Sequence, residues 1–293
     1  MTPILQIESL CKSYKGFSLQ NVSFTLPQGC IMGLVGQNGA GKSTTMKGIL
    51  GLIRPDSGSV KLFGQELSEN ESAIKEQIGV VFDSMNLPEM LKGKDIGKVM
   101  GPLYQNWDQA AFESYLERFS LPPQKRIKDY SRGMKMKAAI AVALSHHAKL
   151  LLLDEATGGL DPIVRDEILD ILLEFMQDPT HGILFSSHIT GDLEKIADYV
   201  TFIHEGKVRF SQPKDELLDR CAVIKCEEEI LSAIDPAQII GIRRYPYGIE
   251  ALIYRQAVPA GVAAQRPTIE DMMLFIARGE RECEVFCIKI SAT

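Results

Sequence analysis

Near its start this chain has an apolar run that leads directly into a glycine-rich segment. Residues 30–35 are almost entirely apolar, and the sequence GQNGAGKS follows at residues 36–43. A continuous apolar run is typical of a strand buried on both faces of a parallel sheet. The glycines leave room for backbone N–H groups to approach an anion, and a helix expected over residues 42–53 adds its positive end. The segment therefore predicts a phosphate-binding loop at the end of a central strand.

The side chains of this loop have separate expected roles. Lys42 would neutralise phosphate charge, the Ser43 hydroxyl would ligate Mg²⁺, and Thr44 would add a phosphate contact. A chance match is disfavoured, because the mechanism requires the apolar strand before the loop and the helix after it. The expected nucleotide contacts of the loop are Gly36, Asn38, Gly39, Ala40, Gly41, Lys42, Ser43 and Thr44.

A second apolar strand ends in two adjacent acids. Residues 150–153 are four leucines, and Asp154 and Glu155 follow them. A carboxylate at Asp154 can hold Mg²⁺ through its water shell, and Glu155 is placed to polarise an attacking water as general base. A solvated turn is the alternative, and the phosphate loop elsewhere in the chain disfavours it.

The surrounding pattern predicts an α/β fold. Strands are expected at residues 4–10, 17–26, 60–63, 149–153, 183–185 and 199–203. Parallel strands joined by helices, with a phosphate loop at one strand end, form a sheet covered on both faces. Residues 84–148 are expected to be helical, because aromatic residues recur there at helical spacing. Core packing explains most of that stripe, and docking of a partner stays open for part of it.

The character of the chain changes near Pro213. The expected elements are a helix (214–219), a strand (222–226), a short helix, two strands (239–244 and 249–255), a helix (269–277) and a last strand (283–290). This order suggests a small ferredoxin-like α+β domain. Thr268 and Asp271, after Pro267, supply a good helix start.

Composition excludes several classes of protein. The net charge of −6 over 293 residues argues against a protein that coats nucleic acid. No run approaches the roughly 18 apolar residues of a membrane span, and the N-terminus lacks a secretory signal. We therefore expect a cytoplasmic protein whose six cysteines are reduced. The spacings C-x4-C and C-x3-C near the C-terminus favour ordinary buried thiols over a zinc site.

Three further segments complete a series of motifs. Residues 130–134 have the sequence YSRGM, residues 159–162 have the sequence GLDP, and His188 follows the strand expected at 183–185. In this order the motifs resemble those of the ATP-binding subunits of ABC transporters, over about residues 1–210. The resemblance implies a P-loop NTPase of the ABC ATPase fold at residues 1–212, with a helical subdomain at about 84–148. Residues 213–293 would then form a C-terminal accessory domain.

The resemblance also implies ligands and roles. ATP and Mg²⁺ are the expected cofactors, and Tyr14 would stack on adenine. His188 would contact the γ-phosphate as a switch histidine and act with Glu155 and Lys42 in hydrolysis. A lone histidine after a strand is usually structural, so this role depends on the whole series.

The segment at residues 130–134 departs from the family's usual Leu-Ser-Gly-Gly-Gln signature. Arg132 and Met134 replace Gly and Gln, while Ser131 and Gly133 remain. In the family, the two retained residues would touch the γ-phosphate held by a second subunit, at a helix N-terminus. Two roles are open for Arg132: added positive charge at that site, or exposure to solvent. Asp161 would lie in the dimer-contact loop.

A second departure lies at residue 83. The family's stretch corresponding to residues 78–83 ends in glutamine, whereas this chain has Asp83. Asp83 can accept a metal contact, but it adds negative charge beside Asp154 and Glu155. We expect metal dependence to be retained and altered. An Asp83→Gln variant with an unchanged ATPase rate and Mg²⁺ requirement would remove Asp83 as a metal contact.

The resemblance finally implies a mechanism and partners. Two ATP molecules would be sandwiched between two subunits, a homodimer or a heterodimer with another ABC ATPase subunit. Dimer closure would pull the helical region and move an integral membrane subunit. The altered signature and the segment PTIEDMML at residues 267–274 favour an exporter, which places the chain at the inner face of the cell membrane. A cytosolic ABC ATPase with an assembly or regulatory role is the alternative.

Overall fold

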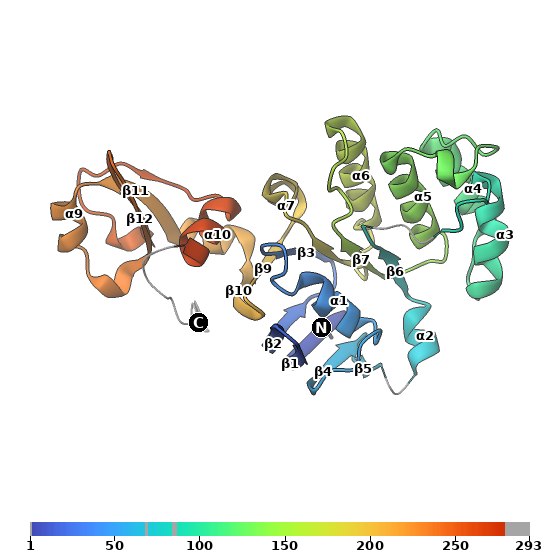
Figure 1. The fold of residues 1–293 in the computed structure, drawn as a ribbon, viewed down its shortest axis with the longest axis horizontal. Helices are drawn as coiled ribbons and strands as arrows, with labels where there is room; N and C mark the ends of the chain where they lie inside the picture. Colours follow the sequence, from blue (N-terminus) through green and yellow to red (C-terminus); the bar gives the residue numbers. More distant parts are fainter. Residues whose placement is uncertain (1, 68–69, 84–86, 279–293) are drawn as a thin grey trace.

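A six-stranded, mostly parallel sheet forms the centre of the molecule. The computed structural model describes residues 2–67, 70–83 and 87–278 (Figure 1). The strand order is β10-β9-β3-β8-β7-β6; β10 alone is antiparallel to its neighbour. The strands are β3 (Cys30–Val35), β6 (Ile78–Val81), β7 (Leu150–Asp154), β8 (Gly182–Ser186), β9 (Tyr199–His204) and β10 (Lys207–Pro213). The predicted α/β fold is confirmed, and β7 and β8 are buried along their whole length.

An antiparallel sheet packs beside the central one. Its order is β2-β1-β4-β5, with β1 at Leu5–Tyr14, β2 at Phe17–Leu26, β4 at Ser57–Leu62 and β5 at Gln65–Glu66. Helix α1 (Lys42–Ile49) shares a hydrophobic cluster with both sheets, through Met46 and Ile49. The helix was predicted to extend to residue 53, but it ends at Ile49 because Gly51 adopts a φ of +66° and turns the chain.

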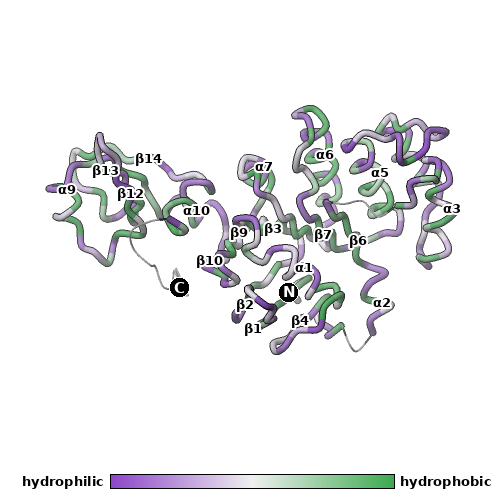
Figure 2. The backbone as a smooth tube through the Cα atoms, viewed as in Figure 1, coloured by the Kyte–Doolittle hydropathy of each residue, from purple (hydrophilic) through white to green (hydrophobic). Residues whose placement is uncertain are grey.

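Helices cover the other parts of the central sheet. Between β4 and β7 lie α2 (Glu71–Lys75), α3 (Ile96–Met100), α4 (Gln109–Arg118) and α5 (Arg132–Leu144); α6 (Pro162–Phe175) and α7 (Thr190–Ile196) follow. Short 3-10 helices lie at Gly93–Asp95, Gly101–Leu103, Ile127–Asp129, Pro236–Gln238 and Arg255–Ala257. The aromatic stripe packs inward: Phe112 is fully buried, and the Trp107 ring lies 5.3 Å from it. Figure 2 shows hydrophobic residues along β6 beside these helices.

A second antiparallel sheet follows the first three-quarters of the chain. Figure 1 shows it as a separate lobe joined to the rest near β10 and α10. Its order is β12-β13-β11-β14, with helices on both faces. The elements are α8 (Lys214–Arg220), β11 (Cys221–Cys226), α9 (Glu228–Ala233), β12 (Ile239–Tyr245), β13 (Gly248–Tyr254), β14 (Ala264–Gln265) and α10 (Ile269–Arg278). The strand predicted at residues 283–290 lies outside the described residues, and the two-residue β14 was not predicted.

The C-terminal sheet buries both of its faces in different clusters. One face, with Ile224, Ile242 and Ile253, packs only against its own lobe. The opposite face, with Leu252 and the α10 residue Phe275, belongs to the same cluster as α7 and the central sheet. The lobe is therefore continuous with the main core on one side. Within the described residues, none of the helices has the length and apolar character needed to cross a bilayer.

Candidate functional site

Three segments far apart in the sequence meet at one edge of the central sheet. Strands β3, β8 and β7 are parallel neighbours, with Leu34 opposite Ser186 and Asp154 opposite Ser186. Their carboxyl ends therefore lie side by side. Ligands of open α/β sheets bind at such an edge. The phosphate loop, the acidic pair and the segment of His188 start at these three strand ends.

The phosphate loop is wrapped around the Lys42 ammonium. Lys42 is 5% exposed, and its Nζ donates to the carbonyl oxygens of Gly36 at 2.8 Å and Gln37 at 3.4 Å. A Cβ on Gly36 would lie 2.3 Å from the Ile203 carbonyl oxygen, so only glycine fits there. In the described structure no side chain caps the N-terminus of α1. Its first N–H groups are therefore free to bind an anion.

One member of the acidic pair, Glu155, lies between the lysine and the histidine. Glu155 Oε1 lies 3.4 Å from Lys42 Nζ, and Glu155 Oε2 contacts His188 Nδ1 and accepts from the His188 backbone N–H at 3.3 Å. Asp154 is buried, and its Oδ1 accepts from the Ser186 hydroxyl at 2.9 Å. The three predicted catalytic residues, Lys42, Glu155 and His188, therefore lie in contact with one another through Glu155.

The backbone of Glu155 is unusual. Its φ is +55°, in the left-handed region that costs a non-glycine residue roughly 1–2 kcal/mol. The Glu155 N–H is held by the Ser186 carbonyl oxygen at 3.0 Å, and the Gly158 N–H donates back to the Glu155 carbonyl oxygen at 3.0 Å. This turn directs the Glu155 side chain away from the strand and toward Lys42 and His188. Local strain of this kind is concentrated at functional sites.

Two predicted second-subunit residues cap helices in this chain. Ser131 Oγ accepts from the Met134 N–H at 3.2 Å at the start of α5. Asp161 Oδ1 accepts from the N–H groups of Ile163 at 3.1 Å and Val164 at 3.0 Å at the start of α6. The two helix starts are neighbours, because a Cβ on Gly133 would lie 3.2 Å from Val164 Cγ1. Among the described residues, no hydrogen bond joins Ser131 or Asp161 to the phosphate loop, so they form a second group beside it.

Three other predicted contacts lie apart from this network. Tyr14 is 47% exposed at the end of β1, and Lys12 Nζ lies over its ring, 5.7 Å from the ring centre. Its adenine contact stays a prediction. Ser43 is exposed and Thr44 is half-buried on the first turn of α1. Their contacts with Mg²⁺ and phosphate stay predictions.

Asp83 has a partner that sequence reasoning missed. Its Oδ1 accepts a hydrogen bond from Arg132 Nη2 at the start of α5. Neither role considered for Arg132, charge at the neighbouring nucleotide or exposure to solvent, included this pair. The available signal was that the two departures from the family pattern carry opposite charges. The metal contact at Asp83 stays a prediction, with Arg132 as its competitor.

Comparisons with known proteins fit this geometry. A family model described as ABC transporter matches residues 19–158. The bacitracin transport ATP-binding protein BcrA of Enterococcus faecalis is 35% identical over 209 residues, covering 70% of this chain and 68% of that relative. An uncharacterized ABC transporter ATP-binding protein of Bacillus subtilis (strain 168), YhcH, is 26% identical over 97% of this chain and 99% of its own length. A solved ATP-binding subunit of an ABC transporter aligns with a TM-score of 0.67 at 28% identity, over 73% of this chain and 91% of that one.

Proposed function

This chain belongs to the ABC transporter family as an ATP-binding subunit, and we propose that it powers a membrane exporter by ATP-driven closure of a subunit pair. The observation that carries the proposal is the contact of Glu155 with both Lys42 and His188 at the carboxyl ends of β3, β7 and β8. A nucleotide-binding module without turnover would not need an acid held between these two groups.

The residues of the loop fit a nucleotide phosphate and its Mg²⁺. The uncapped α1 N-terminus and the buried Lys42 ammonium supply positive potential, and glycine at residue 36 keeps the loop closed. The Ser43 hydroxyl and the Asp154 carboxylate would hold Mg²⁺, an ion that prefers hard oxygen ligands and keeps several waters. Bound Mg²⁺ would neutralise charge that develops on the transferred phosphate.

Glu155 supplies the base of the proposed hydrolysis. In this structure its carboxylate faces Lys42 on one side and His188 on the other. Phosphate oxygens would compete with Glu155 for the Lys42 ammonium. That exchange frees one carboxylate oxygen to accept a proton from the attacking water. His188 Nδ1 would keep the other oxygen in place, which fixes the direction of the free lone pair.

A second subunit would complete each nucleotide site. Ser131 and Gly133 lie at the start of α5, and Asp161 lies at the start of α6 beside them. In this chain Ser131 and Asp161 already satisfy their own helix starts, so only their outward sides are available to a ligand. We infer that this surface meets the γ-phosphate of the other subunit's ATP. A symmetric homodimer would then have two equivalent sites.

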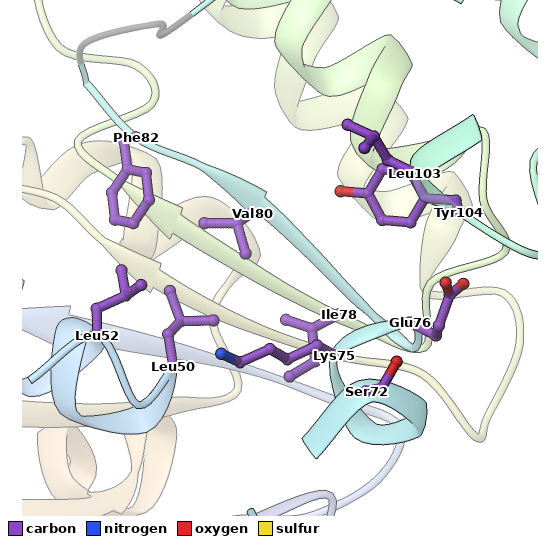
Figure 3. A pocket seen from close by; sticks show the side chains of 10 residues that line it. All are labelled: Leu50, Leu52, Ser72, Lys75, Glu76, Ile78, Val80, Phe82, Leu103 and Tyr104. Carbon is purple, nitrogen blue, oxygen red and sulfur yellow. The ribbon is translucent and has the colours of Figure 1, made fainter. Parts of the chain in front are cut away.

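An apolar groove beside β6 is the proposed contact for the membrane subunit. Figure 3 shows its walls: Leu50 and Leu52 follow α1, Lys75 lies at the end of α2, and Leu103 and Tyr104 precede α4. The groove has a volume of about 370 Å³. Leu52 is 58% and Leu103 is 66% exposed, and exposed apolar clusters of this kind mark binding surfaces.

The occupant we propose is a short apolar helix from a cytoplasmic loop of the membrane subunit. Phe82 lines the groove and is followed by Asp83, which contacts α5. Movement of α5 during dimer closure would therefore shift the residues that line the groove. We therefore propose that the chain works at the inner face of the cell membrane, with the C-terminal lobe as an accessory domain from residue 213 onward.

The first experiment is an affinity purification of tagged Glu155→Gln protein with MgATP, from solubilised membranes and from cytosol separately. Co-purification of a stoichiometric multi-span protein supports the transporter role and identifies the chain that carries the cargo site. A Leu103→Asp variant should lose that partner, whereas Tyr247→Asp, which changes an 84% exposed residue in the C-terminal lobe, should keep it. Recovery of soluble partners alone would instead support a non-transport ABC ATPase.

A further inference from the structure

Two unusual residues of this chain form an ion pair with each other. Asp83 follows β6, Arg132 begins α5, and Arg132 Nη2 donates to Asp83 Oδ1. The two side chains are 52% (Arg132) and 55% (Asp83) exposed. An ion pair that exposed contributes little to stability by itself. The guanidinium group of Arg132 has further contacts besides this pair.

The Arg132 guanidinium packs on a pair of glycines in the turn after Glu155. A Cβ on Gly159 would lie 3.1 Å from Arg132 Nη1 and 3.3 Å from Cζ, and one on Gly158 would lie 3.8 Å from Nη2. With no side chain between them, the flat group covers the backbone of both glycines. Gly159 has a φ of +67°, so a side chain there would be strained as well as crowded.

The same turn also contacts His188. A Cβ on Gly158 would lie 3.3 Å from His188 Cε1. The turn starts at Glu155, whose carboxylate contacts the same histidine. Arg132 and His188 thus both pack against Gly158, and the turn also carries Asp161 at its far end. Displacing the turn would move the base, the histidine and the helix start of α6 together.

We propose that Arg132 is a positioning residue for ATP hydrolysis, holding the turn at residues 155–161 through the face of its guanidinium group. Asp83 is the counter-ion that orients Arg132, rather than a metal contact. Arginine suits this task because its edge can bind a carboxylate while its face packs on a peptide. Lysine keeps the charge but has no such face. The inference rests on the proposed role of Glu155 as the base.

Four variants separate the parts of this arrangement: Asp83→Ala, Arg132→Ala, Arg132→Lys and the double variant Asp83→Ala/Arg132→Ala. Two readouts are needed. The first is amide hydrogen exchange of peptides covering residues 155–161 in the nucleotide-free protein, which does not depend on turnover. The second is steady-state ATP hydrolysis as kcat, KM and the Mg²⁺ concentration for half-maximal rate. Arg118→Ala is the matched control, because Arg118 makes a similarly exposed ion pair with Glu174, on the outer helices.

Exchange in residues 155–161 should rise in Arg132→Ala and Arg132→Lys, and kcat should fall about 10-fold, because sub-ångström misplacement of reacting groups slows chemistry. KM and the melting temperature should stay near wild type. Asp83→Ala should show a smaller change in the same direction. The double variant should match Arg132→Ala, because Asp83 acts only through Arg132. The half-maximal Mg²⁺ concentration should not change in any of them.

Two results would overturn the proposal. Full activity and unchanged exchange in Arg132→Lys would show that charge, not the planar face, is what matters. A raised Mg²⁺ requirement on adding Asp83→Ala to the Arg132→Ala background would make Asp83 a metal contact after all. If neither wild type nor any variant hydrolysed ATP, the proposed function would fail. The amide hydrogen exchange of residues 155–161 would still test the contact between Arg132 and the turn.

Discussion

The central sheet and the C-terminal sheet are built from similar lengths of strand, yet only the first gathers reactive groups. In the central sheet, parallel neighbours β3, β8 and β7 all end at one edge, and each end supplies a charged or polar side chain to the same place. In the C-terminal sheet, antiparallel order sends successive strand ends to opposite edges. Its ion pairs, such as Lys225 with Glu250 and Arg244 with Glu228, lie at the surface of the lobe.

Strand direction decides where reactive side chains gather in these two sheets. A parallel sheet brings residues that are more than 100 positions apart to one point without any special contact between them. An antiparallel sheet brings together residues near in sequence, which favours packing over catalysis. We therefore expect substitutions at the edge of the central sheet to change turnover, and substitutions in the C-terminal lobe to change stability. Four predictions test this contrast, in order of their expected effect on turnover.

Glu155→Gln should cause the largest loss of turnover. Removal of a general base typically costs 10²- to 10⁴-fold, so we expect phosphate release to fall by at least about 100-fold while nucleotide binding persists. The matched control is Glu205→Gln: Glu205 also follows a central strand and also has a positive φ, +49°, but it lies in the β9–β10 turn. Residual turnover above one tenth of wild type in Glu155→Gln would remove Glu155 as the base.

Lys42→Ala should act on binding more than on the chemical step. A charge-assisted hydrogen bond is worth about 1.5–3 kcal/mol, so ATP affinity should fall about 10- to 150-fold. Fluorescent-nucleotide titration would measure this directly. Lys47→Ala, on the exposed side of the same helix, is the control and should bind ATP normally. Equal affinities of the two variants would contradict the phosphate-loop role of Lys42.

The same contrast decides how much could be predicted from sequence. The phosphate loop was predictable because its glycines, its lysine and the preceding strand are local in the chain. The acids after β7 were predictable because a leucine run marks a buried strand. The contact of Asp83 with Arg132 was not, because it joins two segments 49 residues apart and depends on how α5 is placed over β6. No local pattern encodes such a distance.

The C-terminal lobe was harder for a related reason. Its hairpin of β12 and β13 has clear strand and turn residues, and the predicted strand bounds there are close to the observed ones. The two-residue β14 has no sequence periodicity; it is defined only by its pairing with β11. The continuity of the lobe with the main core is also a tertiary property, carried by buried side chains such as Phe275 that look like any other apolar helix residue.

Phe275→Ala should separate stability from catalysis. Phe275 on α10 is 1% exposed and packs in the cluster shared with the central sheet. Its removal should lower the free energy of unfolding by about 3–5 kcal/mol. Turnover of the folded protein at low temperature should stay within about twofold of wild type, since Phe275 touches none of the proposed catalytic groups.

Denaturant unfolding and phosphate release would be measured on the same samples. The control is Tyr247→Ala, which changes an 84% exposed residue of the same lobe. A large fall in kcat without loss of stability would show that the lobe takes part in the chemistry.

Cys221→Ala should leave turnover unchanged and should alter how the free energy of unfolding depends on alkaline pH. Burial at the start of β11 raises the pKa of its thiol from 9.0 to about 12. The unfolded chain therefore releases this proton at lower pH than the folded protein does. The stabilising contribution is fully present below pH 9 and is lost as the pH rises toward 12, by up to about 1.4 kcal/mol per pH unit. Unfolding free energies of wild type and Cys221→Ala at pH 8, 9.5 and 10.5 isolate this term, because the other alkaline groups are common to both proteins. The difference in unfolding free energy between wild type and Cys221→Ala should shrink as the pH rises. A constant difference would mean that the thiol ionises equally in the folded and unfolded chains, and that water reaches the start of β11.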